Sequence, residues 1–288
     1  MALFAGLIAV AFFIGSRAAP YIGPGALNAV RFLIGSVIVG SIAFVMTPPG
    51  SRAALFKPVA FWRFLVLGGC MSIYFIAMFM ALKVTSSVST GAVLTLMPLM
   101  SAGLAFLING QRSSVVLLTS LVVAAAGAIW VIFRGDIHAI LAFNIGKGEA
   151  IFFVGCLAHA THNVFVRRFN RGESTLYFTF WTAVAAFICL TVYSAPELLR
   201  THWTALPPIV WGTILYLATA TTAGAMFLLQ YSMLRIPPAK ANAYMLLTPS
   251  YVIIMEGFAG AGWASPAVMA GALVTVAGLV ILILSPDV

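Results

Sequence analysis

The sequence predicts an all-α integral membrane protein, with ten transmembrane helices that form two inverted five-helix repeats around a central cavity. Three observations predict this fold. Of the 288 residues, 62% are hydrophobic and 7% are charged, whereas soluble domains have about 25% charged residues. Apolar runs of about 20 residues, the length that crosses a bilayer core as a helix, alternate with short polar connections. Two of these runs carry a proline at matching places.

Apolar segments long enough for a crossing follow one another along the whole chain. In order, the predicted ranges are 2–19, 26–46, 62–82, 88–108, 114–133, 148–167, 175–195, 207–230, 239–259 and 264–285. The first segment starts at Met1 with no basic stretch before it and no small-residue cleavage pattern, so we expect it to stay as a span. We expect residues 1–135 to form the first repeat, 136–147 a joining loop and 148–288 the second, inverted repeat.

The positive charges predict an orientation in the cell inner (plasma) membrane. Positively charged connections tend to stay in the cytoplasm. With the N-terminus inside, nine Lys and Arg residues fall in inner connections and five in outer ones, which favours both termini on the cytoplasmic side. The inner set is Arg52, Lys57, Arg63, Arg112, Arg167, Arg168, Arg171, Arg235 and Lys240, and the outer set is Arg17, Lys83, Arg134, Lys147 and Arg200. The net charge of +9 is scattered between apolar runs, so nucleic acid is not an expected partner.

Two predicted spans contain a central proline. Pro98 lies in LTLMPLMSA and Pro249 in MLLTPSYVI, and an offset of 151 residues aligns both prolines and several neighbours. An odd number of crossings per half makes the second copy enter the membrane from the opposite side, as in the inverted repeats of many secondary transporters. A proline frees a helix carbonyl, and such carbonyls often line a site. The alternative is that prolines are simply common in membrane helices.

Side chains that share a helix face with these features are candidates for the cavity wall. In the third span, residues at four-residue spacing combine a ring, a thioether and a branched aliphatic group, which suits a flat apolar substrate; helix packing is the alternative. In the fourth span, Thr90, Leu94 and Pro98 share one face, and Tyr244 lies at the corresponding region of the ninth span. The candidates are Tyr74, Met78, Leu82, Thr90, Leu94, Pro98, Tyr244 and Pro249.

The sixth span contains the polar run HATHN, residues 159 to 163. His159 and Asn163 are four residues apart and share a face, whereas His162 points partly away. Polar groups in a membrane span need a partner or water. We expect His159 and Asn163 to face the cavity and contact the polar end of the substrate, with His159 as the first candidate for proton coupling. The alternative is that they are paired structural groups.

Other polar residues have simpler interpretations. Arg17, Arg31 and Lys83 are expected toward the outer ends of the first three spans, where long basic side chains usually extend to lipid headgroups. A basic vestibule that recognises a carboxylate is the alternative. Glu256 lies near the outer end of its span and is not expected to carry protons. The three cysteines have no metal or redox spacing, so neither a metal nor a cofactor is expected.

Three stretches resemble a known family. ALKVTSSVSTGAVLTLMPLMSAGLAF and MLRIPPAKANAYMLLTPSYVIIMEGF are similar to the two copies of a motif in the EamA-type transporters of the drug/metabolite transporter (DMT) superfamily, and NAVRFLIGSV resembles the Arg-containing pattern of their second span. The chain is most similar to the bacterial aromatic amino acid exporter branch. This resemblance implies ten helices, a central cavity between two halves and outward movement of small organic solutes.

We therefore expect a secondary transporter that exports small organic solutes, namely aromatic or other apolar amino acids, by alternating access. Its expected partners are the small-molecule substrate and the lipid bilayer, and a monomer is expected rather than an obligate oligomer. One alternative is export of organic cations or drugs. Another is an integral membrane enzyme acting on lipid or peptide, which is disfavoured because HExxH is absent and acidic residues number six. A structural subunit would have no use for paired kinks.

Overall fold

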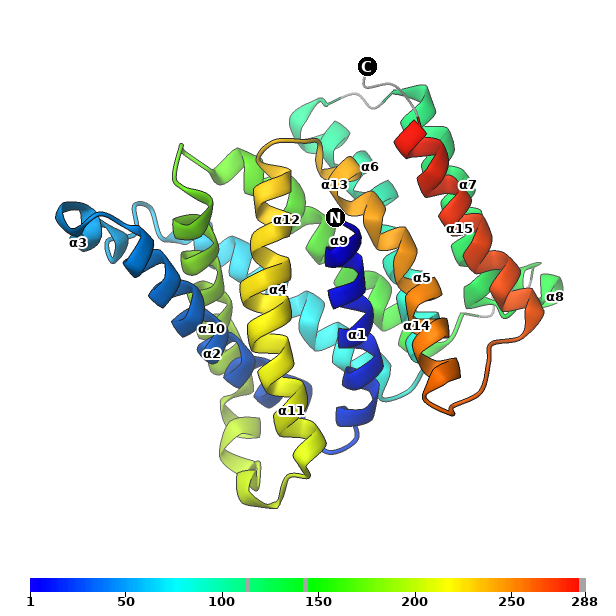
Figure 1. Ribbon diagram of the computed structural model, residues 1–288, viewed down its shortest axis with the longest axis horizontal. Helices are drawn as coiled ribbons and strands as arrows, with labels where there is room; N and C mark the ends of the chain where they lie inside the picture. Colours follow the sequence, from blue (N-terminus) through cyan, green and yellow to red (C-terminus); the bar gives the residue numbers. More distant parts are fainter. Residues whose placement is uncertain (112–113, 142–144, 285–288) are drawn as a thin grey trace.

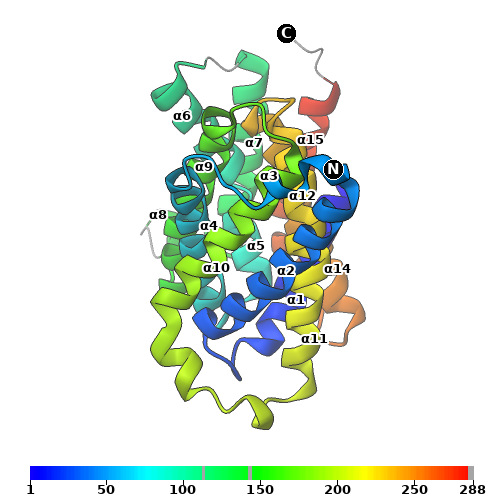
Figure 2. The same cartoon turned by 90° about the vertical axis from the view of Figure 1, so that its left-hand side faces the viewer.

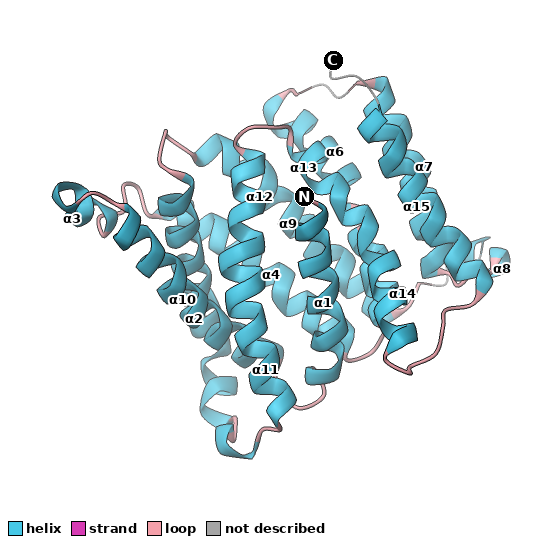
Figure 3. Ribbon diagram, in the orientation of Figure 1, coloured by secondary structure: helices cyan, strands magenta, loops and turns pink. Residues whose placement is uncertain are grey.

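The protein is built from helices. The computed structural model describes residues 1–111, 114–141 and 145–284, and within these ranges every regular element is helical (Figure 1, Figure 3). Seven helical stretches of the described chain are long and apolar enough to cross a membrane. They are α2 (Pro24–Met46), α4 (Trp62–Leu82), α5 with α6 (Ser87–Leu94 and Met97–Asn109), α7 (Val115–Ile132), α9 (Lys147–Phe169), α10 (Thr175–Arg200), and α11, η3 and α12 together (Pro208–Tyr216, Leu217–Ala225 and Met226–Met233). The predicted all-helical class is confirmed for the described residues.

The remaining apolar helices are shorter or interrupted. Two of them, α1 (Ala2–Ala18) and α15 (Pro266–Leu284), are the first and last helices of the described chain; Figure 1 shows α1 in the middle of the molecule and α15 at its right-hand edge, and the start of α1 and the end of α15 lie in the upper part of Figure 2. The predicted span 239–259 is divided into α13, η4 and α14 (Pro238–Ala243, Tyr244–Leu247 and Thr248–Phe258). Short helices occupy the connections: η1 (Pro49–Ser51), α3 (Arg52–Leu55), α8 (Ile137–Leu141) and η2 (Trp203–Ala205).

Serine and proline residues define where several helices begin. The hydroxyl oxygens of Ser86, Ser114 and Ser174 each accept a hydrogen bond from a backbone N–H in the first turn of α5, α7 and α10. Such caps supply a partner for an N–H that has none within the helix. Pro24 and Pro208 stand at the first position of α2 and α11, where the missing N–H would be unpaired anyway.

The two prolines that the repeat analysis aligned occupy equivalent backbone positions. Pro98 is the second residue of α6 and Pro249 the second residue of α14. The preceding residues, Leu96 and Leu247, have φ, ψ of −77°, −15° and −78°, −17°. In both places the regular α-helix is interrupted before the proline, because the ring clashes with the preceding turn and cannot donate a hydrogen bond.

The helices form two edge pairs with a central group between them. The antiparallel pair α2 and α10 lies at one edge and the pair α7 and α15 at the other, while α1, α4 and α9 lie between them (Figure 1). Closely packed residues of the central helices and of the helices beside them form the main core, which includes the rings of Phe12, Phe32, Phe64 and Phe152. A site deep inside the molecule is therefore lined by these central helices and by the inward faces of the helices beside them.

Glycines bring α7 and α15 into backbone contact. A Cβ atom on Gly127 would lie 2.6 Å from the carbonyl oxygen of Gly271 and 2.8 Å from the backbone nitrogen of Thr275. A Cβ atom on Gly278 would lie 2.7 Å from the carbonyl oxygen of Ser120 and 3.0 Å from the backbone nitrogen of Ala124. Adding 151 to 120, 124 and 127 gives 271, 275 and 278. Gly127 and Gly278 are therefore related by the same offset as the residues that they contact: Gly278 contacts Ser120 and Ala124, and Gly127 contacts Gly271 and Thr275.

Candidate functional site

Arg31 is a buried cation that lies between α2, α4 and η3. Its side chain, on α2, is 1% exposed. Nε donates to Thr222 Oγ1 at 3.0 Å, Nη2 to Thr221 Oγ1 at 2.9 Å, and Nη1 to Asn28 Oδ1 at 3.2 Å. The guanidinium carbon lies 3.9 Å from the centre of the Phe75 ring, a cation–π arrangement. The expectation that Arg31 extends to the lipid headgroups is therefore wrong.

The two threonines that hold Arg31 belong to an unusual stretch of backbone. Residues Leu217–Ala225 form the π-helix η3 between α11 and α12. A π-helix bulges outward from the regular α-helical path and is often found at functional sites. Here it brings the adjacent hydroxyls of Thr221 and Thr222 to one guanidinium, and the Thr221 hydroxyl also donates to the Leu217 carbonyl at 2.6 Å.

Arg31 lines a small cavity between the two predicted halves of the chain. The cavity measures about 30 Å³, close to the share of liquid volume taken by one water molecule. Helices α1, α2 and α4 form one part of its wall, and α9, η3, α12 and Met245 of η4 form the other. Its lining residues are apolar and aromatic except for a few polar groups: Phe4, Ile8, Arg31, Phe32, Met71, Tyr74, Phe75, His159, Thr221, Thr222, Ala225, Met226, Leu229 and Met245.

His159 reaches this cavity from α9. The side chain is 4% exposed, and neither ring nitrogen has a hydrogen-bond partner among the described residues. Its ring lies 4.3 Å from the Tyr74 ring, centre to centre, with an angle of 38° between the planes. By contrast, Nδ1 of His162 is 3.1 Å from the Leu67 carbonyl oxygen. Of the two histidines, His159 is the one available to a ligand.

Asn163 is engaged in a chain of side-chain hydrogen bonds. Its Nδ2 donates to Asn242 Oδ1 at 3.2 Å, and Nδ2 of Asn242 donates to Ser101 Oγ at 2.9 Å. This chain of hydrogen bonds connects α9 with α6, which contains Pro98, and with α13, which precedes η4 and Pro249. Asn163 is fully buried and does not belong to the lining of the Arg31 cavity. The structure therefore places Asn163 between helices and leaves its proposed contact with substrate a prediction.

The other candidates are spread through the core. Tyr74 lines the Arg31 cavity, whereas Met78 and Leu82, one and two turns further along α4, do not. The Thr90 hydroxyl donates to the Ser86 carbonyl within α5. The remaining candidates lie near the two helix interruptions: Leu94, Pro98 and Pro249 are buried there, and Tyr244 is partly buried against a smaller apolar cluster.

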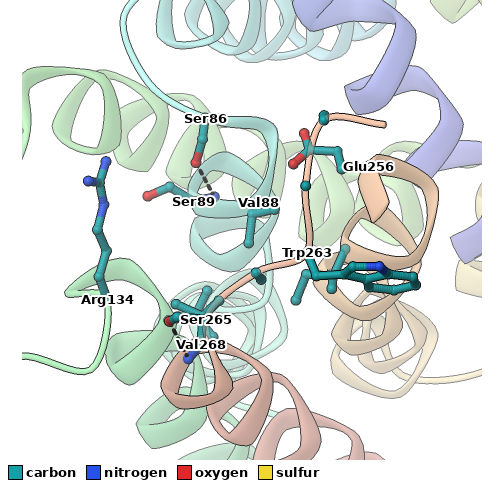
Figure 4. Close-up of a pocket in the computed structure, with 13 residues that line it drawn as sticks. Ser86, Val88, Ser89, Arg134, Glu256, Trp263, Ser265 and Val268 are labelled. Carbon is teal, nitrogen blue, oxygen red and sulfur yellow. Dashed lines mark hydrogen bonds between the residues drawn. The ribbon is translucent and has the colours of Figure 1, made fainter. Parts of the chain in front are cut away.

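A second, larger pocket lies where α5, α14 and α15 converge (Figure 4). It measures about 360 Å³ and includes Ser86, Ser89, Arg134, Glu256 and Trp263. Figure 4 shows the Glu256 carboxylate and the Arg134 guanidinium on different sides of the pocket. The predicted topology places this pocket at the outer membrane face, where both charges can be hydrated. None of its lining residues was among the predicted cavity residues.

Beside this pocket, a carboxylate joins the two predicted halves. The hydroxyls of Thr85 and Ser89 both donate to Oε1 of Glu149, in the first turn of α9. A Cβ atom on the neighbouring Gly148 would lie 2.8 Å from the Thr85 side chain, so the helix and the α4–α5 connection are in close contact. This contact closes the molecule between α5 and α9 at the predicted outer face.

Sequence reasoning underrated Arg31 and missed its threonine partners. The polar run TATT, residues 219 to 222, falls in the middle of the predicted span 207–230 and could have identified a polar patch. The pairing itself could not be read, because Arg31 and Thr222 are separated by 191 positions. Their proximity follows from the packing of α2 against η3.

Comparisons with known proteins identify a family. The uncharacterized transporter YyaM of Bacillus subtilis (strain 168) is 27% identical over 237 residues, which cover 82% of this chain and 77% of that protein. One crystal structure superposes with a TM-score of 0.70 over 98% of this chain and 94% of the other, at 19% identity, which shows a shared fold. The sequence pattern of the EamA-like transporter family matches residues 1–133 and 146–284. A multi-pass, all-helical chain with these matches belongs to the EamA-like transporter family.

Proposed function

We propose that the protein exports small organic solutes, specifically aromatic or other apolar amino acids, across the cell inner membrane by alternating access. The observation that carries this proposal is the cavity at Arg31, which is enclosed by helices from both halves of the chain. Phe, Tyr and Met side chains make up half of its lining residues, and these groups suit a flat apolar moiety. The family supports transport, and the cavity wall supports the substrate class.

The proposal includes ten spans in two inverted repeats. The backbone at Pro98 and Pro249 is equivalent, the glycine contacts of α7 and α15 repeat with the same 151-residue offset, and the family pattern matches one stretch in each half. With ten spans, both ends of the chain lie on one side of the membrane, which agrees with where α1 begins and α15 ends (Figure 2). The charge distribution favours the cytoplasm as that side.

The size of the cavity supports alternating access. A site that encloses a small organic molecule commonly has a volume of about 300–1,000 Å³, whereas the Arg31 cavity measures about 30 Å³. Substrate must therefore enter and leave through conformations in which the halves separate. The contact of Glu149 with Thr85 and Ser89, at the predicted outer face, joins the two halves and is the contact that we expect to open for release.

Flux measurements on purified protein in liposomes test this function. The full chain is reconstituted, loaded with radiolabelled L-phenylalanine, L-leucine or an organic cation such as tetraphenylphosphonium, and assayed for initial efflux with and without an imposed pH gradient. We expect saturable efflux of the amino acids, and a slower rate for Tyr74→Leu. Tyr193→Leu is the matched control, because Tyr193 is 67% exposed. Efflux of the cation alone would refute the proposed substrate class.

His159→Gln and Asn163→Ala separate the two polar candidates. His159 faces the cavity without a hydrogen-bond partner, so its replacement should lower the efflux rate and alter any dependence on internal pH between 6 and 8. Asn163 bonds to Asn242, so its replacement should disturb helix packing instead. Normal rates and an unchanged pH profile in His159→Gln would remove that residue from the site.

A further inference from the structure

Arg31 carries a charge that the described protein leaves without a counter-ion. Among the described residues, Arg63 forms an ion pair with Glu173, and this pair does not include Arg31. Its hydrogen-bond partners, two threonine hydroxyls and an asparagine amide, are neutral. Buried charges in proteins are normally paired, because removing an ion from water without a counter-ion is costly. A cation kept in this state inside a membrane protein is a candidate for binding an anion.

The guanidinium retains donors that could bind such an anion. Arginine has five N–H donors, and each of the three hydrogen bonds of Arg31 uses a different nitrogen. One N–H on Nη1 and one on Nη2 remain without a described acceptor. The two terminal nitrogens of a guanidinium can together bind both oxygens of a carboxylate. The Phe75 ring lies against the face of the guanidinium. It therefore contacts the group without serving as a hydrogen-bond acceptor for these N–H groups.

Independent groups around the same cavity are also available to a ligand. His159 is 4% exposed, lines the cavity and has no described partner for either ring nitrogen. The Thr222 hydroxyl accepts from Arg31 Nε, and no described group accepts its own hydrogen. An unpaired cation, an unpaired imidazole and a hydroxyl donor thus converge on one enclosed space. Most of the other lining residues are aromatic, thioether or aliphatic.

We propose that Arg31, Thr222 and His159 form a carboxylate-binding subsite in the central cavity, and that Arg31 selects solutes bearing a carboxylate. This inference rests on the proposed transport function and specifies which end of the solute is recognised. The carboxylate binds the free N–H groups of Arg31 and accepts from Thr222. The apolar part of the solute contacts Tyr74 and the neighbouring thioethers. An organic cation would bring a second positive charge next to Arg31 and is excluded for that reason.

The test compares matched compounds that differ in the carboxylate. Purified full-length protein is titrated with L-phenylalanine, 3-phenylpropionate, L-phenylalaninamide and 2-phenylethylamine, with L-leucine and L-lactate as carboxylates without a ring. Binding is measured from the shift in thermal unfolding, which a ligand of the folded state raises. Wild-type protein should bind the carboxylates at least about tenfold more tightly than the matching amide or amine, the range expected of charge-assisted hydrogen bonds.

Substitutions assign this preference to the subsite. Arg31→Gln should abolish the preference by weakening carboxylate binding about tenfold or more, while binding of the amide stays the same or improves. Thr222→Val keeps the charge and removes one hydrogen bond to it, so it should weaken carboxylate binding by a smaller factor and serves if Arg31→Gln does not fold. Arg17→Gln is the matched control, because Arg17 donates to the Phe13 carbonyl on its own helix and does not line the cavity.

The outcomes separate this inference from the proposed function. If only L-leucine or L-lactate binds, and the binding depends on Arg31, the subsite stands and the aromatic substrate is wrong. If wild-type protein binds the amine as tightly as the acid, or binds no carboxylate, the subsite is refuted. It is also refuted if folded Arg31→Gln and Thr222→Val both keep the full preference. Amino acid efflux that persists in those variants would leave the transport function intact.

Discussion

The backbone contact of α7 with α15 makes a quantitative prediction about stability. In Gly127→Ala, the new methyl group would lie 2.6 Å from the Gly271 carbonyl oxygen, where ordinary contacts are 3.4–4 Å. In Gly278→Ala, it would lie 2.7 Å from the Ser120 carbonyl oxygen. The obstructing atoms belong to helix backbone, so no side-chain rotation can relieve either contact. The two helices must move apart, and overpacking of this kind costs about 1–3 kcal/mol.

The control removes the effect of alanine itself. Gly103, within α6, has no atom within 4 Å of the position of a Cβ atom, so Gly103→Ala changes backbone propensity without a clash. Unfolding of the purified variants in detergent, by heat or by titration with sodium dodecyl sulfate, gives the three stabilities. We expect Gly127→Ala and Gly278→Ala to be about 1–3 kcal/mol less stable than Gly103→Ala, by similar amounts.

Similar losses at both glycines are the part that tests the repeat. A pseudo-two-fold axis makes the two sites equivalent, so the two substitutions should act alike. Stability of Gly127→Ala equal to that of Gly103→Ala would refute the backbone contact. A clear loss at one glycine with none at the other would refute the equivalence of the two sites and, with it, the 151-residue relation.

Three further predictions concern topology, the prolines and acid sensitivity. Reporter fusions after residue 140 and at the C-terminus should fall on opposite membrane faces; signals from the same face would contradict the inverted repeat. Pro98→Ala and Pro249→Ala should insert and fold, because alanine can donate the missing helical hydrogen bond, but efflux in liposomes should fall severalfold; unchanged efflux would show that the interruptions do not shape the pathway. Burial raises the pKa of the Glu173 carboxyl, but hydrogen bonds from Arg63 and from backbone N–H groups outweigh burial and hold it below its usual 4.5. The stabilisation of the folded state by ionised Glu173 is therefore complete above pH 4.5 and is lost as the pH falls through the lower folded-state pKa. Glu173→Gln should remove this part of the acid dependence of unfolding. An unchanged acid profile in that variant would exclude the Arg63–Glu173 pair as its source.

The helical ranges could be predicted because the membrane imposes a length on each apolar run. The predicted range 26–46 corresponds to Pro24–Met46, and 62–82 to Trp62–Leu82. The prolines also indicated where regular helix would be interrupted, although the change of helix type at Tyr244–Leu247 was not predicted. Local rules of this kind need only the neighbouring residues in the sequence.

The site was harder to predict, because its polar groups meet across the molecule. The spacing of Tyr74, Met78 and Leu82 indicates one face of α4, but three residues on that face span two turns and only Tyr74 reaches the cavity. Arg31 looks like an ordinary basic residue in a span until Thr221 and Thr222 are placed against it. Its role depends on the packing of α2 with η3, which hydropathy cannot show.

The hydrogen-bond chain through Asn163, Asn242 and Ser101 affects how fast the protein can change shape. All three groups are uncharged, and polar contacts between membrane helices contribute only about 0.6 kcal/mol on average. Separating α9 from α6 and α13 therefore meets a low barrier at this point, and water entering an opening cavity can replace each bond. An ionic joint in the same place would hold one conformation long enough to limit turnover. Neutral side chains thus hold these helices in register through bonds that water can replace.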